Sequence, residues 1–296
     1  MSANPPIVVG VDGSRSSNDA VWWAAENAVR RGAPLHLVAT LFVAGTYGVP
    51  IGLPPAYFDD QEVEGKRRLS GATDLAREAA SGNPLSIESE LVSGQPSRVL
   101  LERARGARMV VVGSRGLGEV TGGLLGSVST PVAAHAGCPV AVIRAIADPE
   151  GAAGGPVVVG VDGTENSEPA IAEAFLEASL RGVELIAVHA WSDVNLSNLL
   201  TNERSLDWTS IRAREEASLA ECLAGFGENF PDVAVRRVVV QDRGLQALIE
   251  FSKQSQLVVV GSRGRGGFAS LLLGSTSRAL LHSVTSPLMI VRRPEQ

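Results

Sequence analysis

Glycines and serines recur in one fixed pattern at two places in the chain. The letters GSRG at 113–116 precede GSVS at 126–129 with nine residues between them, and GSRG at 261–264 precedes GSTS at 274–277 at the same spacing. Glycine lets backbone amides approach a phosphate closely and adopt positive φ angles. A Gly-Ser pair at a helix start offers free N–H groups, a hydroxyl and the positive end of the helix dipole. The spacing therefore predicts a clamp for one polyphosphate in each half of the chain.

Two widespread phosphate-binding sequences do not account for this pattern. A Walker A loop needs Gly-Lys-Ser/Thr, and no lysine follows Gly126 or Gly274. The dinucleotide fingerprint would place G-x-G-x-x-G in the first strand-to-helix turn, which reads VDGS at 11–14. The alternative is that the glycines only form turns, because glycine-rich loops are common false positives. Two copies with identical internal spacing favour the clamp.

The chain repeats itself. VVGVDG at 8–13 recurs at 158–163 with an offset of 150, and VVVGSRG at 110–116 recurs at 258–264 with an offset of 148. Blocks in one order at nearly one offset indicate two copies of a domain of about 145 residues, a common domain size. The segment between the copies, ADPEGAAGGP, is rich in Gly, Ala and Pro and has the composition of a linker. We therefore expect domains at 1–146 and 157–296, joined by a linker at 147–156.

Short apolar runs alternate with helical patterns in each copy. In the first copy we expect strands at 7–11, 35–41, 87–92, 109–112 and 139–143, and helices at 61–80, 97–104 and near 129–136. A further helix should begin at a cap on Ser16 or Ser17 and end at Gly32, and 43–60 should be a loop. Such alternation predicts a parallel, doubly wound α/β sheet. A ligand then lies beyond the carboxyl ends of the strands, where the glycine motifs fall.

Composition excludes several classes of protein. Apolar residues make up 45% of the chain and charged residues 20%, which is too apolar for a disordered chain. The net charge of −6 and the 4% share of aromatics argue against a nucleic-acid partner. Cys138 and Cys222 are too few for a disulfide framework. Without a signal-peptide pattern or an apolar run long enough to span a bilayer, we expect a cytoplasmic protein with no membrane span.

The pattern G-x-x-G, nine residues, then G-S after the fourth strand, with VDGS after the first, resembles the universal stress protein family in its ATP-binding branch. The resemblance covers essentially the whole chain as a tandem pair. It implies two doubly wound five-stranded parallel sheets, Rossmann-like and similar to the adenine-nucleotide alpha hydrolases, each with strand order 3-2-1-4-5. It also implies ATP, with or without Mg²⁺, near the ends of the first, second and fourth strands, and a homodimer.

The resemblance carries site residues over by position. The aspartate after each first strand would meet the nucleoside or a metal beside it, the glycine in that strand would allow close approach, and the end of each second strand would contact adenine. These residues are Gly10, Asp12, Thr40, Gly160, Asp162 and Ala190. Ribose and phosphates would be held by Gly113, Ser114, Arg115, Gly116, Leu117, Gly118, Gly126, Ser127, Val128 and Ser129, and by Gly261, Ser262, Arg263, Gly264, Arg265, Gly266, Gly267, Gly274, Ser275, Thr276 and Ser277.

The aspartates and histidines are candidate ligand-binding, turn-forming or metal-binding residues. Asp193 follows the second strand of the second copy, where a carboxylate could accept hydrogen bonds from ribose hydroxyls. Each Asp-Gly pair after a first strand could also be a plain turn. The four histidines have no metal-ligand spacing, so we expect no metal ligands among them and no catalytic residue.

Three functions of different class fit these residues. The first is a nucleotide-dependent regulator in stress or growth adaptation, which binds ATP and hydrolyses it slowly at most, because the motif supplies no general base. The second is an adenylating or ATP-hydrolysing enzyme of the same superfamily. The third is a nucleotide-free interaction module whose last strands, 140–143 and 288–291, offer sheet edges for pairing. The sequence favours the first function and leaves its protein partner open.

The copies differ beside the expected phosphates. Copy one has Glu119 where copy two has Gly267, and copy two has Arg265 where copy one has Leu117. Pro131 should make the helix after the first Gly-Ser pair start later or bend.

We therefore expect tighter nucleotide binding in copy two, since a carboxylate repels phosphate and a guanidinium attracts it. Calorimetric titration of ATP into Gly116 and Gly264 variants checks this expectation. The Gly264 variant should lose more affinity, and equal losses from both variants would contradict it.

Overall fold

The structure of the chain, a computed structural model, describes residues 4–41, 55–116, 126–144, 154–191, 208–264 and 273–293. It divides into two compact units, Met1–Ala145 (unit 1) and Ile146–Gln296 (unit 2). Each unit is an α/β domain built on five parallel strands.

The strands of each unit pair in the order that the resemblance to the universal stress protein family implies. In unit 1 they are β1 (Ile7–Val11), β2 (Leu35–Leu41), β3 (Ile87–Ser93), β4 (Met109–Gly113) and β5 (Val140–Ile143), in the spatial order β3-β2-β1-β4-β5. In unit 2 they are β6 (Val157–Val161), β7 (Leu185–Trp191), β8 (Val235–Gln241), β9 (Leu257–Gly261) and β10 (Leu288–Val291), in the order β8-β7-β6-β9-β10. The expected fold class, a doubly wound sheet of order 3-2-1-4-5 in each copy, is confirmed.

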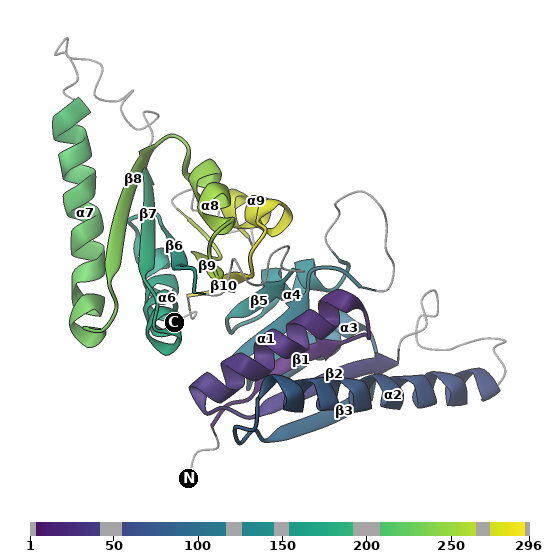
Figure 1. Ribbon diagram of the computed structural model, residues 1–296. Helices are drawn as coiled ribbons and strands as arrows, with labels where there is room; N and C mark the ends of the chain where they lie inside the picture. Colours follow the sequence, from purple (N-terminus) through teal and green to yellow (C-terminus); the bar gives the residue numbers. More distant parts are fainter. Residues whose placement is uncertain are drawn as a thin grey trace. The chain divides into compact units, whose positions relative to one another are not determined.

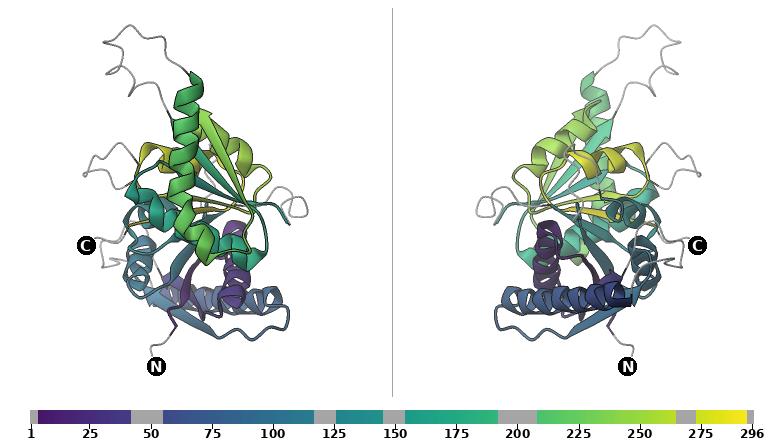
Figure 2. Two further views of the ribbon diagram at one scale, coloured as in Figure 1. Left: turned by 90° about the vertical axis from the view of Figure 1, so that its left-hand side faces the viewer. Right: turned by 90° about the vertical axis from the view of Figure 1, so that its right-hand side faces the viewer.

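Helices cover both faces of each sheet (Figures 1 and 2). The helices of unit 1 are α1 (Arg15–Arg31), α2 (Pro55–Ala79), α3 (Pro96–Ala104) and α4 (Ser129–His135). Those of unit 2 are the short 3-10 helix η1 (Glu165–Ser167), α6 (Glu168–Arg181), α7 (Trp208–Asn229), α8 (Gly244–Ser252) and α9 (Ser275–Ser283). Helix α1 packs with α2 and α3 with α4, and α6 packs with α7 and α8 with α9. The central strands are consequently shielded on two sides.

This shielding explains the composition of the strands. All residues of β5 and β10 are buried, as are the first four of β4 and β9, and these strands are runs of Val, Ile, Leu, Met and Ala. A strand buried on both faces needs apolar residues at every position rather than at alternate ones. The outer strands β3 and β8 are half-exposed and carry charged side chains, which protects a sheet edge from pairing with another chain.

The first helix is held by its two ends. The Ser14 side chain accepts a hydrogen bond from the Ser17 N–H at 3.2 Å, so Ser14 is the N-cap and the expectation of a cap on Ser16 or Ser17 is wrong. The helix ends where expected, because Gly32 adopts φ 58° and its N–H closes the last turn. Gly182 ends α6 in the same way with φ 64°.

Two other expectations concern prolines. Helix α2 begins at Pro55, so the expected loop over 43–60 is wrong for 55–60, and 43–54 lie outside the described residues. A proline opens a helix well because the first N–H groups have no helical partner in any case. The helix after the first Gly-Ser pair was expected to start late, and this is confirmed. Helix α4 begins at Ser129, whereas α9 begins directly after Gly274. Pro131 lies in the first turn of α4, where its missing N–H does no harm.

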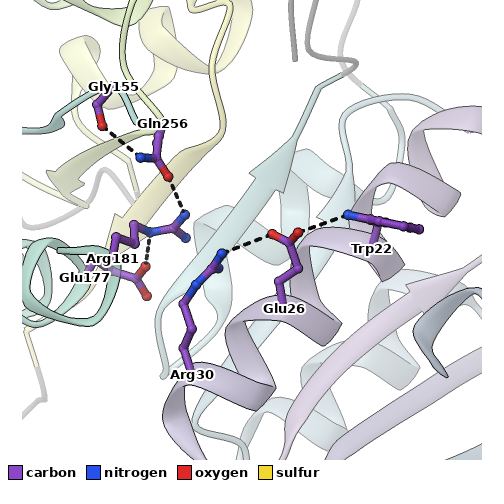
Figure 3. Close-up of polar contacts among 7 residues, drawn as sticks. All are labelled: Trp22, Glu26, Arg30, Gly155, Glu177, Arg181 and Gln256. Carbon is purple, nitrogen blue, oxygen red and sulfur yellow. Dashed lines mark hydrogen bonds and ion pairs between the residues drawn. The ribbon is translucent and has the colours of Figure 1, made fainter. Parts of the chain in front are cut away.

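Polar side chains tie the end of α6 to the amino-terminal edge of its sheet (Figure 3). Arg181 pairs with Glu177 at 2.8 Å, and both side chains are buried, with 4% and 0% of their surface exposed. Arg181 also donates to the Gln256 side chain at 3.2 Å, which donates to the Gly155 carbonyl at 2.9 Å. A buried carboxylate needs such partners, because desolvation without them is costly.

In unit 1 different residues make the corresponding link. Arg108 donates to the Asn4 side chain at 2.6 Å, and Asn4 donates to the Gly32 carbonyl at 2.7 Å. Along the exposed side of α1, Glu26 accepts from Trp22 at 3.1 Å and pairs with Arg30 at 3.3 Å (Figure 3). In unit 1 the segment before the first strand is thus tied to the end of α1. In unit 2 the corresponding segment is tied to Gln256, just before β9.

Glycine replacements should separate conformational from packing effects. A Cβ at Gly32, Gly182 or Gly71 would meet nothing within 4 Å, so only backbone conformation differs among them. Gly32→Ala and Gly182→Ala should each lower the free energy of unfolding by about 1 kcal/mol, because alanine is strained at positive φ. Gly71→Ala, inside α2, should raise it by about 0.5–1 kcal/mol. Urea denaturation measures all three, and a stabilising effect at Gly32 would contradict this account.

Candidate functional site

A cavity lies at the carboxyl end of the sheet in each unit. The cavity of unit 2 has a volume of about 520 Å³ and is lined by Gly160, Val161, Asp162, Ser167, Val188, Ala190, Gly244, Leu245, Leu248, Val260, Gly261, Arg263, Gly264, Gly274, Ser275, Thr276 and Ser277. The cavity of unit 1 has a volume of about 260 Å³ and is lined by Gly10, Val11, Asp12, Ser17, Val38, Thr40, Pro96, Leu100, Val112, Gly113, Arg115, Gly116, Gly126, Ser127, Val128 and Ser129. Both occupy the point where the strand order reverses, as a doubly wound sheet requires.

The aspartate after each first strand is held by its own turn. In unit 2, Oδ1 of Asp162 accepts hydrogen bonds from the Thr164 N–H at 2.8 Å, the Thr164 hydroxyl at 2.7 Å and the Ser167 hydroxyl at 2.7 Å. In unit 1, Oδ1 of Asp12 accepts from the Ser14 N–H at 2.9 Å. The aspartates therefore form the turn and line the cavity at once. The interpretation of Asp-Gly as a turn and its interpretation as part of a binding site are compatible.

The second carboxylate oxygen lies against the loop after the fourth strand. A Cβ on Gly116 would lie 2.8 Å from Oδ2 of Asp12, and a Cβ on Gly264 would lie 3.2 Å from Oδ2 of Asp162. The first distance is closer than a carbon and an oxygen normally approach, so a side chain at residue 116 would force the Asp12 carboxylate or the loop to shift. The same contact in unit 2 is looser but still tight.

A backbone hydrogen bond joins the two halves of each glycine motif. The Gly126 N–H donates to the Ser114 carbonyl at 3.0 Å, and the Gly274 N–H donates to the Ser262 carbonyl at 2.8 Å. The N–H groups of Ser114 and Ser262 donate in turn to the ends of β5 and β10, at 2.8 Å each. These two serines are buried and lie outside the cavity lining, so their role is to anchor the loop.

The two units differ where the second half of the motif begins. In unit 2, Gly274 is the N-cap of α9 and has no side chain with which to satisfy the first amides, and the next three residues line the cavity. The positive end of the α9 dipole therefore faces the cavity, an arrangement suited to an anion. In unit 1 a turn at Ser127 and Val128 precedes the shorter helix α4, so the helix start is displaced from the glycine.

Most of the residues expected at the site are brought together. Among the expected residues that the structure describes, all line one of the two cavities except Ser114 and Ser262. Outside the described residues lie Leu117, Gly118, Glu119, Asp193, Arg265, Gly266 and Gly267. Gly10 and Gly160 also make room for a leucine, since a Cβ there would lie 3.0 Å from Leu100 and 3.2 Å from Leu248.

Sequence reasoning missed one wall of each cavity. This wall is formed by the helix after the third strand, through Pro96 and Leu100 in unit 1 and through Gly244, Leu245 and Leu248 in unit 2. The third strand ends at the same edge of a parallel sheet as the others, so its following turn was a candidate on topology alone. The serines Ser17 and Ser167, also missed, line the cavities and accept a hydrogen bond from the N–H of Asp12 and of Asp162, at 3.2 and 2.9 Å.

Among the residues that the structure describes, the other titratable groups have structural roles. The ring of His189 is buried, with Nδ1 2.9 Å from the Val161 carbonyl and Nε2 3.0 Å from Glu215, and it braces β7 against β6 and α7. Burial raises the pKa of the Cys138 thiol to about 11, which leaves it without thiolate at neutral pH. Within the described ranges, no three His, Cys, Asp or Glu side chains gather as a metal site. Nor does any helix there combine the length and apolar composition that crossing a membrane requires.

The fold and the cavities define a class of protein: a tandem of doubly wound α/β domains, each with a glycine- and serine-lined cavity at the switch point of its sheet. The model of the universal stress protein family matches residues 4–144 and 155–292. The chain belongs to the universal stress protein family, with one such domain in each unit.

Individual relatives agree with this assignment along the whole chain. Universal stress protein Rv2005c of Mycobacterium tuberculosis is 47% identical over 292 residues, which cover 97% of each chain. Universal stress protein Rv2623 of the same species is 39% identical over 291 residues, covering 97% of this chain and 96% of its own. A crystal structure of a universal stress protein from Archaeoglobus fulgidus has a TM-score of 0.71 at 18% identity and covers 99% of this chain and 98% of its own. At that identity the likeness supports the fold alone.

The serine that closes each aspartate turn should contribute to stability. Ser167 is buried; its hydroxyl accepts from the Asp162 N–H at 2.9 Å and donates to Asp162 Oδ1 at 2.7 Å. Ser167→Ala should lower the free energy of unfolding of unit 2 by about 1–2 kcal/mol, because the Asp162 N–H and Oδ1 each lose a hydrogen bond in a part-buried turn. Ser17→Ala is the matched change, and it should cost less because its hydrogen bonds are longer, at 3.2 and 3.3 Å. Denaturant unfolding of both variants measures the difference, and a larger loss at Ser17 would contradict this ranking.

Proposed function

We propose that the protein is an ATP-binding universal stress protein that acts as a nucleotide-dependent regulator in the cytoplasm. The observation that carries this proposal is the cavity of unit 2, because it joins an apolar wall to a glycine- and serine-rich cradle at a helix start. Its volume of about 520 Å³ falls within the range of small-molecule sites, about 300–1,000 Å³.

The two ends of this cavity suit the two parts of a nucleotide. Val188, Ala190 and Leu248 form an apolar region that fits a purine ring. At the other end, the loop 261–264 and the residues 274–277 present backbone amides and hydroxyls beside Arg263. Amides at a helix start and a guanidinium are the groups that bind phosphate best. This division supports a nucleoside triphosphate rather than a plain apolar ligand.

The charges in the cavity favour binding over fast turnover. Among its described lining residues, Asp162 and Arg263 are the only charged side chains. Oδ1 of Asp162 already accepts three hydrogen bonds from its own turn, so this oxygen is engaged by the turn rather than open to an attacking water. Asp162 would serve to hold a ribose hydroxyl or a Mg²⁺ that accompanies the phosphates. We therefore propose slow hydrolysis at most, with the state of the nucleotide read by a protein partner or by a second copy of the chain in a homodimer.

Nucleotide content and thermal stability test this function. The full chain is purified without added nucleotide and denatured, and the released ATP and ADP are quantified by chromatography. Mg-ATP added to nucleotide-free protein should raise the Tm by several degrees, because ligand at about 100-fold above its Kd adds about 2.7 kcal/mol to the stability. Absence of both bound nucleotide and a Tm shift would contradict the proposal and favour a nucleotide-free interaction module. Pyrophosphate release with a carboxylic acid present would point instead to an adenylating enzyme.

A further inference from the structure

The two cavities share nearly all of their lining yet differ twofold in volume. Of the 16 described residues that line the cavity of unit 1, 13 have an identical counterpart in the lining of unit 2. The volumes are nevertheless about 260 and 520 Å³. The three differing pairs are Thr40 and Ala190, Pro96 and Gly244, and Val128 and Thr276. Valine and threonine have almost the same volume, so the first two pairs are the ones in which the lining residues differ in bulk.

These two pairs occupy equivalent places in the fold. Thr40 and Ala190 each lie one residue before the end of the second strand of their unit. Pro96 and Gly244 are each the first residue of the helix that follows the third strand. Helix α8 packs against β7 in unit 2 as α3 packs against β2 in unit 1 (Figure 1). The pairs therefore form the same wall in both cavities, at the end away from the glycine loops.

In unit 2 the two positions lie directly against each other. A Cβ on Gly244 would lie 2.6 Å from the Cβ of Ala190, which is closer than two carbon atoms approach without a bond. The wall of unit 2 thus has no room for a side chain at 244, even next to the smallest one at 190. Unit 1 carries a branched side chain and a proline ring at these positions, so its wall must be built differently.

The wall of the cavity differs between the units in the backbone just before helices α3 and α8. Proline disfavours the helical region for the residue before it, and Gln95 is extended with ψ 125°. Gly244 places no such restriction, and Arg243 has ψ 35°. Asp242, before it, adopts φ 53° and its N–H donates to the Trp191 carbonyl at 2.8 Å, which fixes this turn to the end of β7. Residue 96 or 244 therefore sets both the bulk of the wall and the path of the chain into the helix.

We infer that this pair of positions decides which unit accepts the nucleoside part of the ligand. Ala190 and Gly244 leave space for the base and ribose in unit 2, whereas Thr40 and Pro96 exclude them from unit 1. The cavity of unit 1, at about 260 Å³, lies below the usual range for small-molecule sites although its glycine loops are retained. The chain consequently binds one nucleotide, in unit 2. This inference rests on the proposed function, because it concerns which cavity holds the ATP.

Counting bound nucleotide in variants of the full chain tests this inference. Equilibrium dialysis with Mg-ATP should give one tight site per chain in the natural protein. Ala190→Thr should weaken that site by about 10–100-fold, the range expected for added bulk in a fitted pocket. Threonine suits a strand, so this variant should fold normally, and thermal unfolding without ligand checks that it does. Gly244→Ala is a second route to the same loss, through the contact with Ala190.

The reciprocal change in unit 1 is the matched variant. Thr40→Ala combined with Pro96→Gly should raise the number of nucleotides bound per chain from one to two, while leaving the site of unit 2 unchanged. A natural protein that binds two nucleotides with equal affinity would overturn the inference and leave the proposed function intact. An Ala190→Thr variant that folds and binds Mg-ATP as tightly as the natural protein would also overturn the inference and leave the proposed function intact. No binding of Mg-ATP at all would overturn both.

Discussion

Each cavity depends on the close contact between the loop after the fourth strand and the aspartate that ends the first strand. The two strands are neighbours in the sheet, and the strand order reverses between them, so no helix fills the space beyond their ends. A side chain at residue 116 would press against the carboxylate, and one at residue 264 would require a smaller shift of it. The aspartate in turn is held by Ser14 or by Thr164 and Ser167. The glycine-rich end of each cavity is therefore formed by backbone whose position a side chain would disturb.

Duplication has preserved most of the residues that line the cavity and altered a few of them. The glycine loops, the aspartate turn and the leucine from the third-strand helix are identical in the two linings. The differences lie in the wall at positions 40 and 96 or 190 and 244, and in the start of the last helix, where Pro131 accompanies a later start of α4. Both kinds of change accompany the larger cavity of unit 2. Tandem copies can thus diverge in the size of a cavity while most of the residues that line it stay the same.

Much of this architecture was predictable because local rules and the global fold agree. Periodicity located the strands within about a residue, and the fully apolar runs of β4 and β9 indicated burial on both faces. The cap was misplaced because three serines lie within four residues, and only the observed hydrogen bond from the Ser17 N–H distinguishes Ser14 from its neighbours. The start of α2 was missed because prolines there suggested a loop, whereas Pro55 opens the helix.

The sequence by itself determined the duplication, the parallel α/β sheet and the glycine and serine residues at its carboxyl edge, because repeats, periodicity and spacing are one-dimensional properties. The strand order 3-2-1-4-5 was implied only by the resemblance to the universal stress protein family. Only the tertiary structure decided how large each cavity is and what closes it. Residues 190 and 244 are more than 50 positions apart along the chain, and their contact exists because parallel strands end at one edge. Side chains that meet in this way compete for volume, and no local pattern records that competition.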